Sequence, residues 1–290
     1  MKKALFYLMA VAAMTVTACE KGNPAAGDPG DAALVAGTWY LRVEDGDNEW
    51  AFTEDGKFTI TEYLYKQEGS YSVTGTSLTM KASKAWEKDY VRDEMSRPVR
   101  DESGEYVLTD WKETGADTKA VTYSVKKLYG GDAMILGGAA DEYSGSDDLL
   151  NIPLINKEAS HLSDIGLIQG KWYWRMFGKG SGARAVVIVN GSNAEIIITP
   201  WGERYTGAIT YEQGRIQMSN PTFYTSRYQD TENPDVWEHI NEEHPEDTPW
   251  RMPDGDYYSA YSYIIMPFIV EGNTAYATVA NLYSTFQKQQ

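Results

Sequence analysis

Two short stretches of similar sequence, GTWYLR at residues 37–42 and GKWYWR at residues 170–175, decide the fold of this chain. In each, a Gly-x-Trp tripeptide opens a run in which apolar side chains occupy every second position; in the first copy these are Trp39, Leu41 and Val43. An apolar period of two is typical of a half-buried β-strand. Each copy therefore predicts the first strand of a sheet.

The same order of short runs and turns follows each copy. The first has the hairpin signal Asp55-Gly56 and the second has Asn190-Gly191, both of which accept the positive φ of a tight turn. Further along, Gly207 follows Gly69 by 138 residues, and Tyr261 follows Tyr123 by the same distance. Self-similarity of this kind indicates a duplicated domain.

Each half contains about eight short alternating runs and no convincing long helix, which favours a small antiparallel barrel. We therefore expect an all-β protein with two tandem antiparallel β-barrels, at residues 37–138 and 167–290. Between them, residues 139–166 begin with a small, acidic stretch and continue with the apolar residues 149–155. This segment is expected to be a linker with a short packed portion.

The beginning of the chain has the pattern of an export signal. Lys2 and Lys3 precede an apolar run at residues 4–16 that is too short to span a bilayer comfortably, so residues 1–18 read as a signal peptide. The end of this segment, VTAC at residues 16–19, resembles the lipobox of bacterial lipoproteins, in which the cysteine is lipidated. We expect lipidation of Cys19 and a flexible tether at residues 19–36; the alternative is an ordinary signal peptide with a free cysteine nearby.

Composition limits the classes of partner. The chain has 26 basic and 42 acidic residues, a net charge of −16, which makes nucleic acid an unfavourable partner. Cys19 is the one cysteine, so no intramolecular disulfide can form. The 21 tyrosines and 9 tryptophans suit half-buried strands and wet cavities, because each ring combines an apolar body with a polar tip.

The motif search does not single out a catalytic residue. His239 and His244 lack the spacing of a zinc protease, and residues 45–49 lack the reach of a calcium-binding EF-hand. No Gly-x-Ser-x-Gly elbow occurs in the sequence. We expect no enzymatic activity, no cofactor and no metal, and leave open a glycosidase carboxylate pair, since 42 acidic residues always include close pairs.

Two long connections are the expected place for binding. Residues 84–110 and 221–256 occupy the same place in the repeat, and both mix aromatic and acidic side chains. Long connections on a rigid barrel commonly carry function. The candidate ligand-binding residues in or beside them are Trp86, Tyr90, Trp111, Tyr224, Tyr228, Trp237 and Trp250.

The ordered set of motifs resembles the lipocalin-like domains of Bacteroidetes lipoproteins. The resembling residues are Gly37, Trp39, Asp55, Gly56, Gly69 and Tyr71 in the first copy, and Gly170, Trp172 and Gly207 in the second. The second copy departs from the pattern with Ile209 in place of the tyrosine and Ser192-Asn193 in place of Asp-Gly. The resemblance implies that each Gly-x-Trp is structural and that its tryptophan closes one end of a barrel core.

The leading functional hypothesis is a non-catalytic binding or interaction protein, held in the cell envelope at the outer membrane through acylated Cys19. Its ligand would be a small hydrophobic molecule, a carbohydrate or another envelope protein. The alternatives are a carbohydrate-binding accessory lipoprotein of a glycan-uptake system and, more remotely, a glycoside hydrolase.

Overall fold

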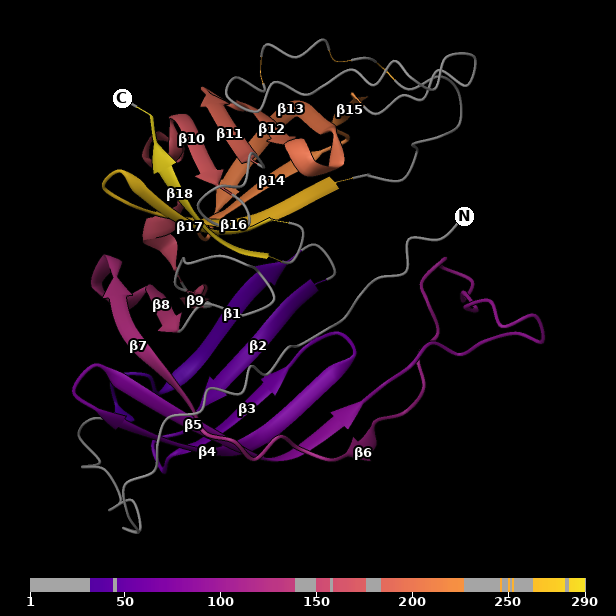
Figure 1. The fold of residues 1–290 in the computed structure, drawn as a ribbon, viewed down its shortest axis with the longest axis vertical. Helices are drawn as coiled ribbons and strands as arrows, with labels where there is room; N and C mark the ends of the chain where they lie inside the picture. Colours follow the sequence, from indigo (N-terminus) through magenta and orange to yellow (C-terminus); the bar gives the residue numbers. More distant parts are fainter. Residues whose placement is uncertain are drawn as a thin grey trace. The chain divides into compact units, whose positions relative to one another are not determined.

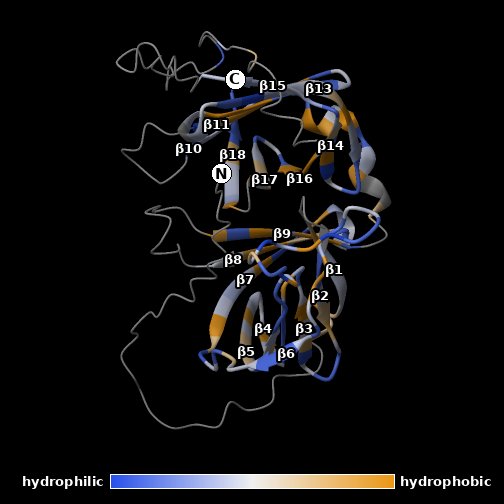
Figure 2. Cartoon of the chain, turned by 90° about the vertical axis from the view of Figure 1, so that its right-hand side faces the viewer, coloured by the Kyte–Doolittle hydropathy of each residue, from blue (hydrophilic) through white to orange (hydrophobic). Residues whose placement is uncertain are grey.

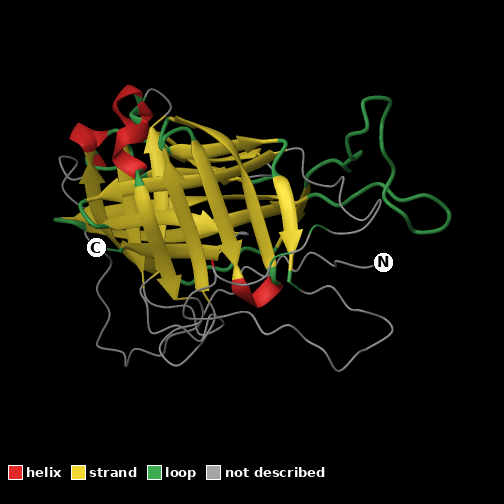
Figure 3. Cartoon of the chain, turned by 90° about the horizontal axis from the view of Figure 1, so that it is seen from above, coloured by secondary structure: helices red, strands yellow, loops and turns green. Residues whose placement is uncertain are grey.

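The computed structural model describes residues 32–43, 46–138, 150–156, 159–175, 184–226, 246, 250, 252, 263–279 and 282–289. These residues form two antiparallel sheets, and each sheet closes on itself as an eight-stranded barrel with one additional strand (Figure 1). Helix is limited in the described residues to short turns (Figure 3). The expected all-β architecture of two tandem barrels is confirmed.

The first barrel closes in the order β1-β2-β3-β4-β5-β7-β8-β9, with β9 beside β1, and β6 pairs with β5. Its strands are β1 (Gly37–Val43), β2 (Gly46–Phe52), β3 (Lys57–Thr61), β4 (Tyr65–Thr74), β5 (Ser77–Glu87), β6 (Lys112–Thr114), β7 (Val121–Leu128), β8 (Ala133–Gly138) and β9 (Leu150–Asn156).

The second barrel closes in the corresponding order β10-β11-β12-β13-β14-β16-β17-β18, and β15 pairs with β13. Its strands are β10 (Gly170–Arg175), β11 (Arg184–Asn190), β12 (Asn193–Ile198), β13 (Glu203–Glu212), β14 (Arg215–Ser219), β15 (Thr222–Thr225), β16 (Tyr263–Glu271), β17 (Thr274–Val279) and β18 (Leu282–Lys288). The strands of both barrels carry hydrophobic and hydrophilic residues side by side (Figure 2), because one face is buried and the other meets water.

The first barrel extends beyond the boundary expected from the sequence. Residues 149–155 were expected to belong to a linker segment, but β9 pairs with β1, with Asn156 opposite Trp39, and supplies the eighth strand. Four consecutive residues of β9 are buried, so the strand lacks the alternation that marks a half-buried strand. The small, acidic stretch before it suggested a domain boundary and concealed this last strand.

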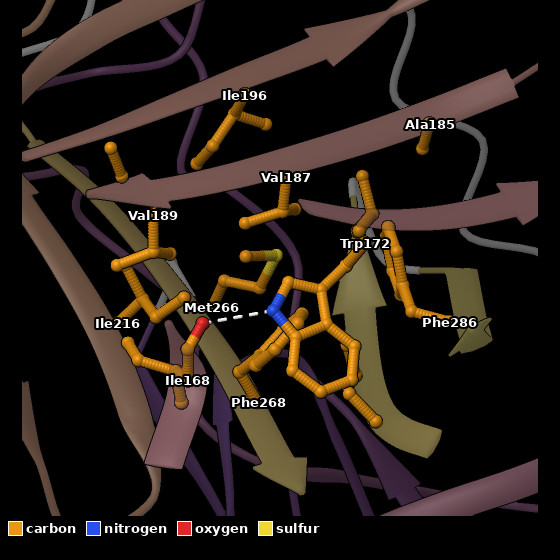
Figure 4. Close-up of a cluster of buried hydrophobic side chains, with 14 of the residues drawn as sticks. Ile168, Trp172, Ala185, Val187, Val189, Ile196, Ile216, Met266, Phe268 and Phe286 are labelled. Atoms are coloured by element: carbon orange, nitrogen blue, oxygen red, sulfur yellow. Dashed lines mark hydrogen bonds between the residues drawn. The ribbon is translucent and has the colours of Figure 1, made fainter. Parts of the chain in front are cut away.

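The Gly-x-Trp tripeptides occupy equivalent places in the two barrels. Trp39 and Trp172 are almost fully buried, and each indole N–H donates at 2.8 Å to a carbonyl oxygen four residues earlier, that of Val35 or Ile168. Figure 4 shows the bond from Trp172 to Ile168. Ile168 ends the short helix η3 (Ile165–Ile168). The glycine two residues before each tryptophan has a positive φ, +127° and +109°, which glycine adopts without the cost of a Cβ atom. This turn folds the chain back over the tryptophan and closes one end of the barrel.

The middle of each barrel follows a common register. Tyr71 lies opposite Met80 in the first barrel, and Ile209 lies opposite Met218 in the second, which keeps the spacing of 138 residues found in the sequence. β15 continues the path of β14 beside β13, so that β14 and β15 together correspond to the long strand β5.

The spacing changes after the long connection. Tyr123 lies opposite Leu78, and in the second barrel Met266 lies opposite Ile216, so Met266 is the counterpart of Tyr123. The sequence comparison had matched Tyr123 with Tyr261, which lies outside the described residues. The second connection is therefore longer than the first.

Candidate ligand-binding site in the first barrel

The interior of each barrel can be read from rows of residues that lie opposite one another on neighbouring strands. A central row begins at the buried tryptophan of β1 or β10 and crosses the neighbouring strands in turn, as far as β5 in the first barrel and β15 in the second. In the first barrel it is Trp39, Trp50, Ile60, Gln67 and Ala85. In the second it is Trp172, Val187, Ile196, Tyr205 and Phe223.

A second row lies one inward position further from the Gly-x-Trp end. In the first barrel it contains Leu41, Asn48, Glu62, Tyr65 and Glu87, the ladder continuing through the backbone bond from Glu62 N–H to the Tyr65 carbonyl. In the second it contains Trp174, Ala185, Ile198, Glu203 and Thr225.

The second barrel fills this half of its interior with its own side chains. Its row members Trp174 and Ile198 belong to one continuous buried cluster together with Tyr205 and Phe223. The Tyr205 and Phe223 rings lie 5.1 Å apart, and the Tyr205 hydroxyl donates to Glu203 Oε2 at 2.9 Å. An eight-stranded barrel can be filled by its side chains in this way.

The first barrel has no aromatic ring at the three positions that these rings occupy. Leu41 stands where the second barrel has Trp174, Gln67 where it has Tyr205, and Ala85 where it has Phe223. Two of the remaining inward positions carry Asn48 and Glu62, both half-buried. The first barrel is therefore less bulky at these three positions and more polar than its counterpart, although elsewhere in the two rows Trp50 replaces Val187 and Tyr65 replaces Glu203.

Glu62 is the polar group whose chemistry differs most from that of a free side chain. It follows the buried Ile60 at the end of β3, on the same face, and its counterpart in the second barrel is the buried Ile198. Burial raises the pKa of Glu62 from 4.5 to about 7, because a low-dielectric environment disfavours the charged form. At neutral pH this carboxyl group is close to half ionised.

Other titratable groups lie in the same half of the barrel. Burial is the main cause of the raised pKa of Tyr65, and the negative charges of Glu62, Glu87 and Asp117 raise it further. Three carboxyl groups therefore act on one phenol in this part of the barrel. Elsewhere in the barrel, burial also raises the pKa of Tyr123, which lies opposite Leu78 on β5.

Trp50 brings an unpaired donor into the central row. Its side chain is 5% exposed, and its indole N–H is buried without a hydrogen-bond partner among the described residues. The counterpart in the second barrel is Val187, which has no polar group to satisfy. A buried donor without an acceptor costs about 1–3 kcal/mol, so a polar ligand that supplies an acceptor would recover this energy.

The aromatic residues chosen from the sequence lie elsewhere or outside the described residues. Trp86 and Tyr224 are counterparts on the outward side of β5 and β15. Each lies under the cation directly opposite it on the neighbouring strand, Lys66 at 4.9 Å and Arg204 at 5.3 Å from the ring centroid. One face of each ring is thus already covered, as in other cation–π pairs.

Trp111 and Tyr90 also pack against the chain itself. Lys88 Nζ lies 4.6 Å from the Trp111 ring centroid, and Tyr90 meets the ring of Tyr106 at 5.0 Å. Trp250 is half-buried. Cys19, Tyr228, Trp237 and the two histidines of the second connection lie outside the described residues.

The first long connection folds into a three-armed element at residues 88–109 rather than an open loop. Three valines form a closed ring of backbone hydrogen bonds: Val91 N–H donates to Val107, Val107 to Val99 and Val99 to Val91, at 2.8–3.0 Å. Two arms end in turns held by Asp93 and Asp101, whose carboxylates accept backbone N–H groups. This element projects from the barrel wall in Figure 3.

The sequence signal for the interior site was present but required the two copies to be aligned position by position. Glu62 stands where the other copy has Ile198, Gln67 where it has Tyr205, and Tyr123 where it has Met266. Attention to aromatic residues in the long connections directed the prediction to the outer wall.

Comparisons with protein-family models, curated proteins and solved structures found no match. Within the described ranges, no three His, Cys, Asp or Glu side chains converge to hold a metal ion. The same part of the chain contains no helix long and apolar enough to cross a membrane.

Proposed function

We propose that this is a non-catalytic binding protein of the cell envelope, anchored through a lipid on Cys19, and that its first barrel binds a small ligand. The observation that carries the proposal is the replacement of three space-filling aromatic rings, Trp174, Tyr205 and Phe223, by Leu41, Gln67 and Ala85. A barrel of this size that is not filled by its own side chains can hold one small ligand. The second barrel serves as a filled scaffold.

The anchor is supported by the sequence at residues 1–19, a short positive region, an apolar run and a lipobox-like end. Several acyl chains on one residue hold a protein to a membrane, at about 0.8 kcal/mol for each buried methylene. Membrane fractionation of cells that express the Cys19→Ala variant should find the protein soluble or unprocessed. Undiminished membrane retention of this variant would contradict the lipid anchor.

Ligand entry into the first barrel can be tested by introducing the aromatic residues of the second barrel at the matching inward positions of the first. The Gln67→Tyr/Ala85→Phe double variant places the Tyr205–Phe223 pair at the equivalent positions. N-phenyl-1-naphthylamine, a neutral apolar dye that fluoresces when buried, should bind the natural protein and lose at least tenfold in affinity for the double variant.

The matched control adds the same residue types to the outer side of the same two strands. Glu68 lies opposite Lys84 on β4 and β5, next to the Gln67–Ala85 pair, so the Glu68→Tyr/Lys84→Phe variant should bind the dye as the natural protein does. Thermal unfolding of both variants checks that they fold. Equal dye affinity in all three proteins would exclude the interior of the first barrel as the site.

A further inference from the structure

The charges at the polar end of the first barrel select the charge of a ligand. Glu62 is half-buried, and burial is the cause of its raised pKa, with no contribution from a described cation. The groups that act on this region from neighbouring elements are Tyr65 on β4, Glu87 on β5 and Asp117 before β7. Lys127, further along β7, lies instead over the Trp39 ring at 4.8 Å. A cationic group would complement this arrangement and an anion would be repelled.

The Trp50 indole N–H adds a second and independent requirement. It is a buried donor without an acceptor among the described residues, on a side chain that is 5% exposed. Trp50 lies opposite Ile60 on β3, and Glu62 follows Ile60 by two residues, so the three share one face of the sheet. A ligand that satisfies both groups therefore carries a hydrogen-bond acceptor as well as a cationic group.

A metal ion does not fit these two features. Within the part of the chain that the structure describes, no three potential metal ligands converge, and a metal ion would leave the Trp50 N–H unsatisfied. The same two rows contain the apolar Leu41, Ile60 and Ala85 beside the polar Asn48 and Gln67, a mixture that suits an organic body with polar groups.

We infer that the first barrel binds a small organic cation, with a protonated amine beside Glu62 and an oxygen acceptor on the indole N–H of Trp50. This inference rests on the proposed function and specifies the ligand class for the same site. Binding of the amine favours the ionised form of Glu62, so the carboxyl group releases its proton on binding. Affinity should therefore rise as the pH increases from 6 to 8.

Four related compounds separate the two requirements by calorimetric titration of the purified full chain. Tyramine carries an amine and a phenol oxygen, phenethylamine the amine alone, 4-ethylphenol the oxygen alone, and 4-hydroxyphenylacetate an anion in place of the amine. Tyramine should bind at least tenfold more tightly than each of the others. If 4-ethylphenol or 4-hydroxyphenylacetate binds as tightly as tyramine, the inferred cation is wrong.

Two variants assign the effect to the residues. Glu62→Gln should remove the advantage of tyramine over 4-ethylphenol and its pH dependence, and Trp50→Phe should remove the advantage of tyramine over phenethylamine. Glu68→Gln is the control, because Glu68 is an outward carboxylate paired with Lys66 at 2.8 Å, and it should change neither. Retention of the full tyramine preference in Glu62→Gln would overturn the inference.

The dye experiment distinguishes failure of the ligand class from failure of the proposed function. If none of the four compounds binds but N-phenyl-1-naphthylamine enters the first barrel, the organic cation is excluded and the binding barrel stands. If the dye is also excluded from the barrel, both proposals fail.

Discussion

The two barrels share one frame, meaning their strand order and pairing register, and differ in the side chains of their interiors. Strand order, register and the buried tryptophan of the first strand are repeated, whereas three inward positions that carry Trp174, Tyr205 and Phe223 in the second barrel carry Leu41, Gln67 and Ala85 in the first. Backbone pairing and one capping turn are thus sufficient to define the barrel. The interior of the half far from the tryptophan can then change without loss of the frame.

At the end that holds the buried tryptophan, the two barrels make a similar contact with residues from different strands. A lysine lies over the buried tryptophan in both barrels, Lys127 at 4.8 Å and Lys288 at 5.1 Å from the ring centroid. These lysines come from non-equivalent strands, β7 and β18. The two barrels therefore place a cation over the ring from different strands.

The shared end should respond equally in the two barrels. Trp39→Ala and Trp172→Ala each remove a buried ring and its hydrogen bond, and each should lower the free energy of unfolding of its barrel by roughly 3–5 kcal/mol. Urea unfolding of the single and double variants measures both effects. A loss below about 1 kcal/mol for either variant would show that the tryptophan is not equivalent in the two barrels.

Adding a carboxyl group to the interior of the filled second barrel should destabilise it, whereas removing one from the first barrel should stabilise that barrel. The larger change in the free energy of unfolding is expected in the second barrel. Ile198→Glu places the first barrel's carboxyl group in the buried cluster of the second, where Ile198 is 6% exposed. Full burial shifts a carboxyl pKa by up to 3–5 units, which corresponds to a loss of roughly 4 kcal/mol at pH 8. Urea unfolding at pH 8 checks this, with Ile198→Leu as the control; a loss below about 1 kcal/mol would mean that water reaches this position.

Glu62→Gln should stabilise the first barrel at high pH. The folded-state pKa of Glu62 is raised from 4.5 to about 7, so the folded protein binds more protons between these values and its stability falls as the pH rises through this window. The variant should therefore gain about 3 kcal/mol over the natural protein at pH 8 and show no gain at pH 4. Unfolding measured at both pH values tests the sign, and an equal gain at both would contradict the burial of an ionisable group.

The smallest expected difference concerns two glycines at matching positions. A Cβ atom at Gly69 would overlap the Lys81 carbonyl oxygen and lie 2.8 Å from the Phe58 ring, whereas one at Gly207 would meet the flexible end of Met218 at 3.1 Å. Gly69→Ala should cost about 2 kcal/mol and Gly207→Ala about 1 kcal/mol. Parallel thermal melts compare the two, and a larger loss at Gly207 would reverse the assignment of the tighter approach.

The repeated Gly-x-Trp and the alternating runs were sufficient to predict two antiparallel barrels. They failed for β9, because a strand buried over four successive residues has no period of two. They also failed for the interior site, because a polar residue at an inward position looks like any other alternating polar residue until its counterpart is known. Glu62 follows Ile60 by two positions, but only its match with Ile198 shows that a buried residue is expected there.

The strand pairing that closes each barrel decides when that barrel can form as the chain is synthesised from its N-terminus. Trp39 must meet Asn156, and Trp172 must meet Lys288, each partner more than about a hundred residues further along. Contacts of such sequence separation form slowly, and until they form both neighbouring strands present free edges to other chains. The first barrel can close while the second is still open, so β10 and β17, the strands that pair with β18, keep free edges longest.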